Sequence, residues 1–97
     1  MRVEINGVEI RSQADLHRVL AGPLGFGPYY GANLAALWDR LTVDVERPVE
    51  IIWRHASVSR ALMGEEHFIQ VRDLLEAVAE QDRSYGWPDR LTIEFEQ

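Results

Sequence analysis

The sequence contains no cysteine and no lysine, and it has no long apolar run. The absence of cysteine excludes disulfide bonds, thiolate nucleophiles and cysteine-ligated metal sites. No apolar segment approaches the roughly 20 residues that a membrane-spanning helix needs, so we expect no membrane span. The N-terminal residues 1–5 lack the basic and apolar stretches that would predict a signal peptide. We therefore expect a cytoplasmic protein.

Basic residues are the scarcer of the two charged classes, with 10 against 16 acidic residues and a net charge of −6. Nucleic-acid backbones are bound by clusters of Lys and Arg, so this balance argues against a nucleic-acid partner. The same balance suits a basic protein partner, because opposite fields accelerate encounter. A chain of 97 residues with 46% hydrophobic content predicts one folded domain over residues 1–97.

Motifs for metal, cofactor or phosphate binding are also missing. His17, His55 and His67 lack the spacing of a metal site. The chain contains neither a glycine-rich phosphate loop nor a nucleophile elbow. We therefore expect no metal and no cofactor, and we interpret the three histidines as surface or packing residues.

The apolar pattern predicts three strands connected by four helices. Alternating or continuous apolar residues indicate strands at about 2–5, 49–53 and 91–95, the middle one buried on both faces. Apolar residues at helical spacing indicate helices at about 13–22, 33–42, 58–63 and 65–80. We expect Ser12 and Ser57 to cap two of these helices, and Gly22-Pro23 to end the first. Helical connections between strands favour a parallel sheet in a small α/β layer fold.

The segment from Pro28 to Asp39 is the most distinctive part of the chain. It combines two tyrosines and a glycine with an amphipathic helix, whose apolar residues recur at positions 34, 37, 38 and 41. Asp39 lies off this apolar face. A carboxylate on a rigid helix beside aromatic residues suits the binding of a cation. By itself it suits catalysis poorly, because acid–base chemistry needs a second positioned group.

Short motifs that span nearly the whole chain carry a family resemblance. They include Ile5-Asn6-Gly7, Ile10-Arg11-Ser12 and Asp15-Leu16-His17, and they are densest at Tyr29-Tyr30-Gly31, Asn33-Leu34 and Ala36-Leu37-Trp38-Asp39. In these motifs the chain resembles the barstar family of intracellular ribonuclease inhibitors. The resemblance implies a barstar-like α/β domain of three-layer type, with a three-stranded parallel sheet flanked by about four helices.

The resemblance also implies a function. The chain would inhibit a secreted, basic, guanyl-specific (barnase-like) ribonuclease in a 1:1 complex, as an immunity protein or antitoxin and not as an enzyme. The second helix and the loop before it would block the active site, with Asp39 in the place of a substrate phosphate. Tyr29 matches an aromatic contact of the family, and Glu76 matches a second acidic contact. The expected binding surface comprises Tyr29, Tyr30, Gly31, Asn33, Ala35, Trp38, Asp39, Thr42, Asp44 and Glu76.

Several of these residues have expected structural roles beside the functional ones. We expect Tyr30 to be packed and Tyr29 to be exposed. Gly31 is expected to allow a close backbone approach or a positive φ angle. Asn33 is expected to cap the second helix. For Trp38, a core position and an interface position are both open.

The chain departs from the family pattern at three places. Ala35 stands where the family often has an acidic residue, and Val43-Asp44 stands where it often has Gly-Trp. Asp44 is therefore a candidate to compensate for Ala35. About eight extra residues around 81–90 either cap the sheet or widen the interface with Trp87. We interpret Trp53 and Trp87 as structural residues.

Two other functions are consistent with the sequence. The first is a binding module of the same fold that captures a cationic protein toxin other than a ribonuclease. The second is a hydrolase in which Asp39 and Glu76 act as paired carboxylates.

Overall fold

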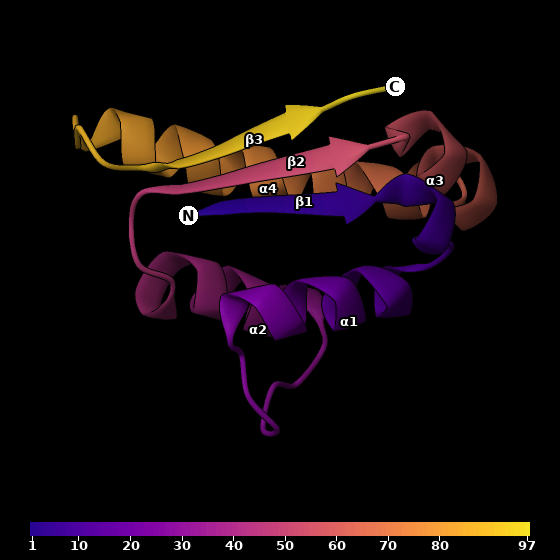
Figure 1. Ribbon diagram of the computed structural model, residues 1–97, viewed down its shortest axis with the longest axis horizontal. Helices are drawn as coiled ribbons and strands as arrows, with labels where there is room; N and C mark the ends of the chain where they lie inside the picture. Colours follow the sequence, from indigo (N-terminus) through magenta and orange to yellow (C-terminus); the bar gives the residue numbers. More distant parts are fainter.

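Three parallel strands form one sheet in the order β1–β2–β3 (Figure 1). The computed structural model describes all of residues 1–97. The strands are β1 (Arg2–Asn6), β2 (Val49–Arg54) and β3 (Leu91–Phe95). In their register, Ile51 of β2 pairs with Val3 on one side and Ile93 on the other. The predicted strands and their parallel arrangement are confirmed.

Four α-helices and two short helical turns connect the strands. No helix is both long enough and apolar enough to cross a bilayer. The helical elements in chain order are η1 (a 3₁₀ turn, Gly7–Glu9), α1 (Gln13–Leu24), α2 (Leu34–Asp39), η2 (a π-helical turn, Arg40–Asp44), α3 (Ala56–Met63) and α4 (Glu65–Ser84).

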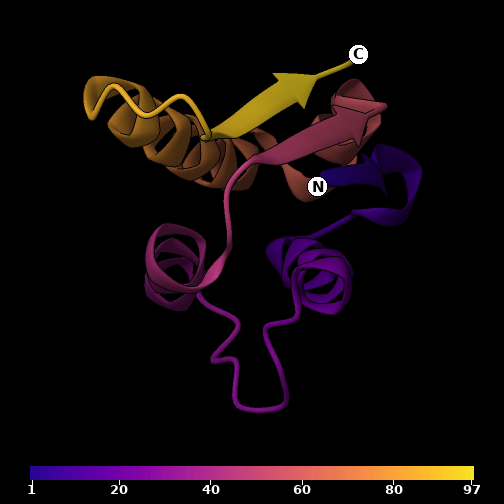
Figure 2. The same ribbon diagram turned by 60° about the vertical axis from the view of Figure 1, so that its left-hand side comes forward.

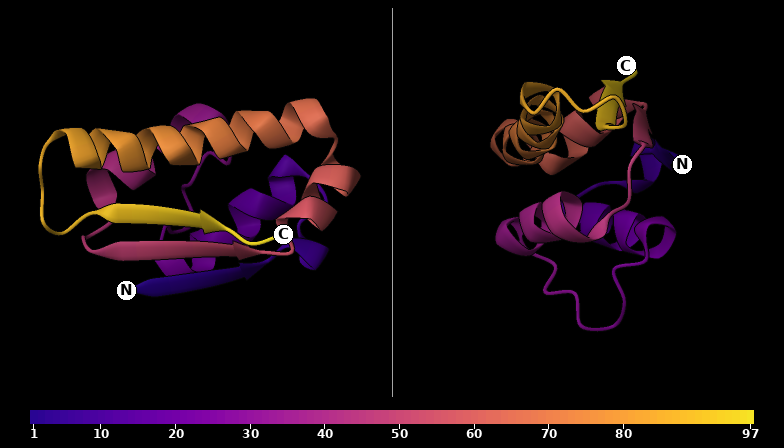
Figure 3. Two further views of the ribbon diagram at one scale, coloured as in Figure 1. Left: turned by 90° about the horizontal axis from the view of Figure 1, so that it is seen from above. Right: turned by 90° about the vertical axis from the view of Figure 1, so that its left-hand side faces the viewer.

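The helices lie on one side of the sheet, as Figure 3 shows from above. On that side Ile51 and Trp53 are completely buried in the core. Ile52 points to the other side and is only 1% exposed, so β2 is buried on both faces, as predicted. Charged side chains cover Ile52: Arg54 pairs with Glu4 at 2.5 Å across this face. The side of the sheet opposite the helices, where a third layer was expected, therefore carries ion-paired side chains and no helix.

Three helix ends differ from their predicted positions. Helix α1 continues through Pro23 to Leu24, because Gly25 adopts the left-handed conformation (φ 67°) and its N–H caps the last turn. Proline this close to the end removes little of the hydrogen-bond ladder. Helix α3 begins at Ala56, after His55 in a left-handed conformation, and not after Ser57. Helix α4 continues to Ser84 because the buried Asp82 extends its inner face.

Asp82 joins three segments that are distant in sequence. Its carboxylate accepts hydrogen bonds from Arg47 Nε at 2.7 Å and from the backbone N–H of Leu91 at 2.7 Å. Burial alone would raise the pKa of Asp82, but the hydrogen bonds from Arg47 and Leu91 and the nearby charges lower it overall. This carboxylate therefore ties the end of α4 to the chain before β2 and to the start of β3.

Candidate partner-binding surface

Helix α2 presents Asp39 to solvent because its opposite face is anchored in the core. Asn33 caps the helix, and its Oδ1 accepts a hydrogen bond from Ala36 N at 2.8 Å, as predicted. Leu37 and Leu41 are fully buried. Asp39 is exposed, and its carboxylate takes part in none of the ion pairs of the molecule. A rigid helix thus holds an unpaired negative charge in solvent.

The π-helical turn η2 changes the direction of the residues that follow Asp39. Its hydrogen bonds close over five residues, as in the bond from Val45 N to Arg40 O at 3.1 Å. Asp44 is the last residue of this turn, and it is exposed. Asp44 is paired with Arg40 at 3.2 Å. The charge of Asp44 is therefore already balanced by an arginine of the same chain.

Thr42 and Trp38 support the helix from within. The Thr42 hydroxyl donates a hydrogen bond to the Trp38 carbonyl at 2.7 Å, which directs it toward its own helix. Trp38 is half-buried and packs against the core. Ala35 is exposed one turn before Asp39. Trp38 therefore lies at the edge of the core, between the core position and the interface position that the sequence left open.

The loop between α1 and α2 protrudes from the body of the molecule (Figure 2). Tyr29 on this loop is 92% exposed. Tyr30 is half-buried, with its ring 4.7 Å from that of Phe26 and its hydroxyl 2.5 Å from His17 Nδ1. The predicted contrast between an exposed Tyr29 and a packed Tyr30 is confirmed. Tyr29 therefore offers a large aromatic surface beside α2.

The backbone of this loop differs from the prediction at one residue. The residue with positive φ is Ala32 (φ 51°) and not Gly31. A left-handed alanine costs about 1–2 kcal/mol. At Gly31, a Cβ atom would lie 3.4 Å from Asn33 Nδ2 and 3.5 Å from Ala36 Cβ, which is close but ordinary contact. Neither of the two alternatives expected at Gly31, a positive φ angle or a close backbone approach, is present, and the left-handed residue is Ala32.

Glu76 is the one predicted binding residue on helix α4. It lines a groove between α4 and β3, together with Ile93. The side of α4 that meets α1 is marked by Gln70, which accepts a hydrogen bond from Gln13 at 2.9 Å. Glu76 lies roughly 120° around the helix from Gln70. Glu76 therefore faces the β3 side of α4 and not the side that meets α1.

The two main concavities of the molecule are not part of the α2 surface. Two concavities of about 650 and 450 Å³ lie elsewhere, between α4 and β3 and beside the N-terminus, and no residue of α2 lines either of them. No group of three or more potential ligands is placed to hold a metal ion. A protruding loop and an exposed helix suit insertion into a partner's cleft better than enclosure of a small substrate.

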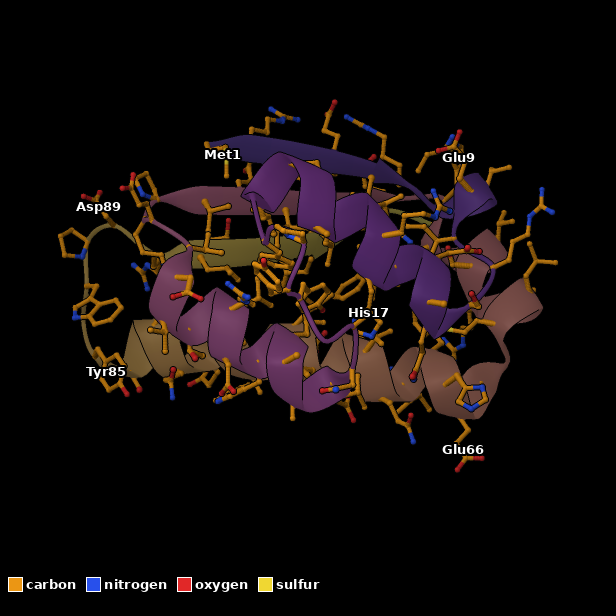
Figure 4. All side chains as sticks on the ribbon, turned by 90° about the horizontal axis from the view of Figure 1, so that it is seen from below. Met1, Glu9, His17, Glu66, Tyr85 and Asp89 are labelled. Atoms are coloured by element: carbon orange, nitrogen blue, oxygen red, sulfur yellow. The ribbon has the colours of Figure 1, made fainter.

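His17 is the residue of this region whose role the sequence did not reveal. It is 3% exposed, lies under the loop near the centre of the face seen in Figure 4, and contacts the hydroxyl of Tyr30. Burial lowers the pKa of His17 and raises the pKa of Tyr30 to about 12. Both groups are therefore neutral near pH 7, and their hydrogen bond holds the base of the loop.

The buried His17 predicts a pH dependence of stability. Its folded pKa lies below the unfolded value of 6.5, so the unfolded chain binds more protons. This contribution to the free energy of unfolding is complete above pH 6.5 and decreases as the pH falls through the folded pKa. Urea titrations at pH 7.5 and 5.5 measure it. In His17→Gln, which does not titrate, the pH dependence should be smaller, and an equal dependence in both proteins would contradict this assignment.

Comparison with known proteins agrees with the fold and with these motifs. The family model described as Barstar (barnase inhibitor) matches residues 1–94. The chain belongs to the barstar family. A Bacillus subtilis (strain 168) protein named "Putative ribonuclease inhibitor YrdF" is 33% identical over 93 residues, which cover 96% of this chain and 98% of that protein. The barstar match therefore extends over the sheet, α2 and α4 together.

Proposed function

We propose that this barstar-family protein inhibits a basic, guanyl-specific ribonuclease by covering its active site with α2 and the loop before it. Asp39 occupies the position of a substrate phosphate, and Tyr29 packs beside it. The complex is 1:1, and the protein serves as an immunity protein that protects its own cell from this ribonuclease.

The observation that carries the proposal is the unpaired, exposed carboxylate of Asp39 on an anchored helix of a barstar-family chain. A site that binds phosphate presents several cationic groups, and a carboxylate placed among them forms charge-assisted hydrogen bonds. Because the α2 backbone is already ordered, binding fixes little additional conformational freedom. The net charge of −6 adds long-range attraction to a basic enzyme.

The family and the shape of the surface also favour an inhibitor over an enzyme. The family model is described as a barnase inhibitor, and the relative is named as a ribonuclease inhibitor. The α2 surface is exposed and lines neither of the two concavities. Such a surface can fill an active-site cleft without any chemistry of its own.

Inhibition assays with a panel of small guanyl-specific ribonucleases test this proposal. We expect at least one enzyme to lose its activity as the inhibitor reaches a 1:1 ratio, with competition against an RNA substrate. Glu66→Ala is a matched control, because Glu66 is an exposed, unpaired acidic residue in the first turn of α4. Activity that persists in every enzyme at a large excess of inhibitor would contradict the proposal.

One observation favours a target whose contacts differ from those of barnase. Ala35 provides no carboxylate, and Asp44 is already paired with Arg40 at 3.2 Å. Asp39 is therefore the one unpaired carboxylate on α2 and η2. A panel without any inhibited enzyme would shift the proposal to a cationic toxin of another class.

A further inference from the structure

Two aromatic side chains are exposed in the loop between α4 and β3. Tyr85 is 56% exposed and Trp87 is 42% exposed, although Trp87 was expected to be structural. Their ring centroids lie 4.9 Å apart with an interplanar angle of 40°. Tyrosine and tryptophan are enriched in the centres of protein interfaces. A tilted pair of aromatic rings exposed to solvent therefore indicates a contact surface.

The loop that carries this pair is fixed at its base. Asp82 accepts hydrogen bonds from Arg47 before the loop and from Leu91 N after it. The Tyr85 N–H bonds to Gln81 O at 3.2 Å, and the Gly86 N–H bonds to Arg83 O at 3.0 Å. The two rings are thus positioned before any partner arrives, which reduces the entropy lost on binding.

No arginine of this chain lies over the face of either ring. The one arginine placed over an aromatic ring is Arg60, 5.7 Å from the centroid of Phe68. The nearby Arg83 is paired with Glu80 instead. Asp89, two residues after Trp87, is exposed and takes part in no ion pair. Aromatic faces beside a free carboxylate suit a guanidinium or ammonium group.

The aromatic pair lies at the same end of the molecule as the end of η2. Parallel strands begin at the same edge of a sheet, and the two segments lead directly into β2 and β3 (Figures 1 and 3). The exposed residues of η2 are Val43, 79% exposed, and Asp44. Figure 4 shows Tyr85 at this end and Glu66 at the opposite end. The end of η2 and the aromatic pair therefore lie at one and the same end of the molecule.

We propose that Tyr85 and Trp87 form a second anchor, which receives an arginine or lysine side chain of the same basic protein that α2 binds. This inference rests on the proposed function and deepens it, because it adds a contact outside the active-site cleft of the partner. A second copy of the chain is a poorer occupant, since two chains of charge −6 repel each other. The anchor would favour those basic ribonucleases that carry an arginine or lysine outside the active-site cleft, where Tyr85 and Trp87 meet them.

Three substitutions of Trp87 test the anchor against the ribonuclease that the protein inhibits best. Trp87→Ala should weaken binding about 3- to 30-fold, the range of an aromatic–cation contact. Trp87→Phe keeps an aromatic face and should lose less affinity than Trp87→Ala. Trp87→Leu keeps apolar bulk without the aromatic face and should resemble the alanine variant. Dissociation constants and off-rates from surface plasmon resonance give these ratios, and circular dichroism confirms folding.

Leu62→Ala is the matched control, because Leu62 on α3 is 55% exposed at the far end of the molecule. Affinity of Trp87→Ala within twofold of the wild type would overturn the anchor while leaving the proposed function intact. Full affinity in Trp87→Leu would overturn the cation as occupant. If the wild-type protein binds none of the ribonucleases, the proposed function and the anchor both fail.

Discussion

Replacing Asp39 by alanine is expected to weaken binding of the target ribonuclease by at least ~2–5 kcal/mol, the cost of truncating one partner of a buried charge pair. The loss arises because the cationic groups of the enzyme remain desolvated without their counter-charge. It should appear mainly as faster dissociation, since the remaining acidic residues still attract the enzyme. Isothermal titration calorimetry and stopped-flow kinetics measure the two effects.

Two variants separate charge from shape in this experiment. Asp39→Asn keeps the size of the side chain and should lose most of the affinity, because an amide cannot balance several cations. Glu66→Ala also removes one negative charge, but at a distant exposed position, and should change affinity little. Folding should be unaffected in all three proteins, because Asp39 is exposed and makes no ion pair. Affinity within a few-fold of the wild type in Asp39→Ala would refute the role of the carboxylate.

Replacing Gly7 by alanine is expected to lower the free energy of unfolding by at least ~3 kcal/mol. A Cβ atom at Gly7 would lie 2.1 Å from the His55 carbonyl oxygen and 2.6 Å from that of Arg54. Both are backbone atoms and cannot move aside alone. The shift would also disturb the hydrogen bond from Ser59 Oγ to Gly7 O at 2.7 Å. Urea denaturation followed by tryptophan fluorescence measures the change.

Gly22→Ala is the matched control for this substitution. Gly22 lies in α1, and a Cβ atom there would meet nothing within 4 Å. Alanine is favoured over glycine inside a helix by roughly 0.5–1 kcal/mol, so this variant should be as stable as the wild type or more stable. Equal stabilities of the two alanine variants would contradict the steric argument at Gly7.

The strands and helices could be predicted because each has a local cause in the sequence. Val49 to Trp53 is a run of strand-forming residues, and it forms the central strand, buried on both faces. Asn33 provides an N-cap, and α2 begins directly after it. The wrong boundaries, at Pro23 and Ser57, fall where a left-handed residue ends or begins a helix. At α1 the left-handed residue is Gly25, which lies two residues beyond the proline that was expected to end the helix. At α3 it is His55, and left-handed conformations of non-glycine residues are set by the surrounding packing and carry weak sequence signals.

The candidate surface was predictable in part for the same reason. Helical spacing alone places Asp39 opposite the buried Leu37 and Leu41, and the resemblance to the barstar family is the source of the partner proposed for that carboxylate. The π turn, the position of Glu76 on the β3 side of α4, and the burial of His17 under Tyr30 all depend on how separate helices pack. None of these follows from residue spacing along one helix.

The sequence by itself determined the α/β class, the parallel sheet and the exposed carboxylate of Asp39, because periodicity and capping act over a few residues. Its short motifs carried the resemblance to the barstar family. The tertiary structure alone decided that Asp82 joins α4 to the chain before β2, that Gly7 meets the His55 carbonyl, and that the aromatic pair of Tyr85 and Trp87 lies at the end of the molecule reached by η2. Those contacts join residues that are distant in sequence, so their existence depends on the packed arrangement of the whole chain.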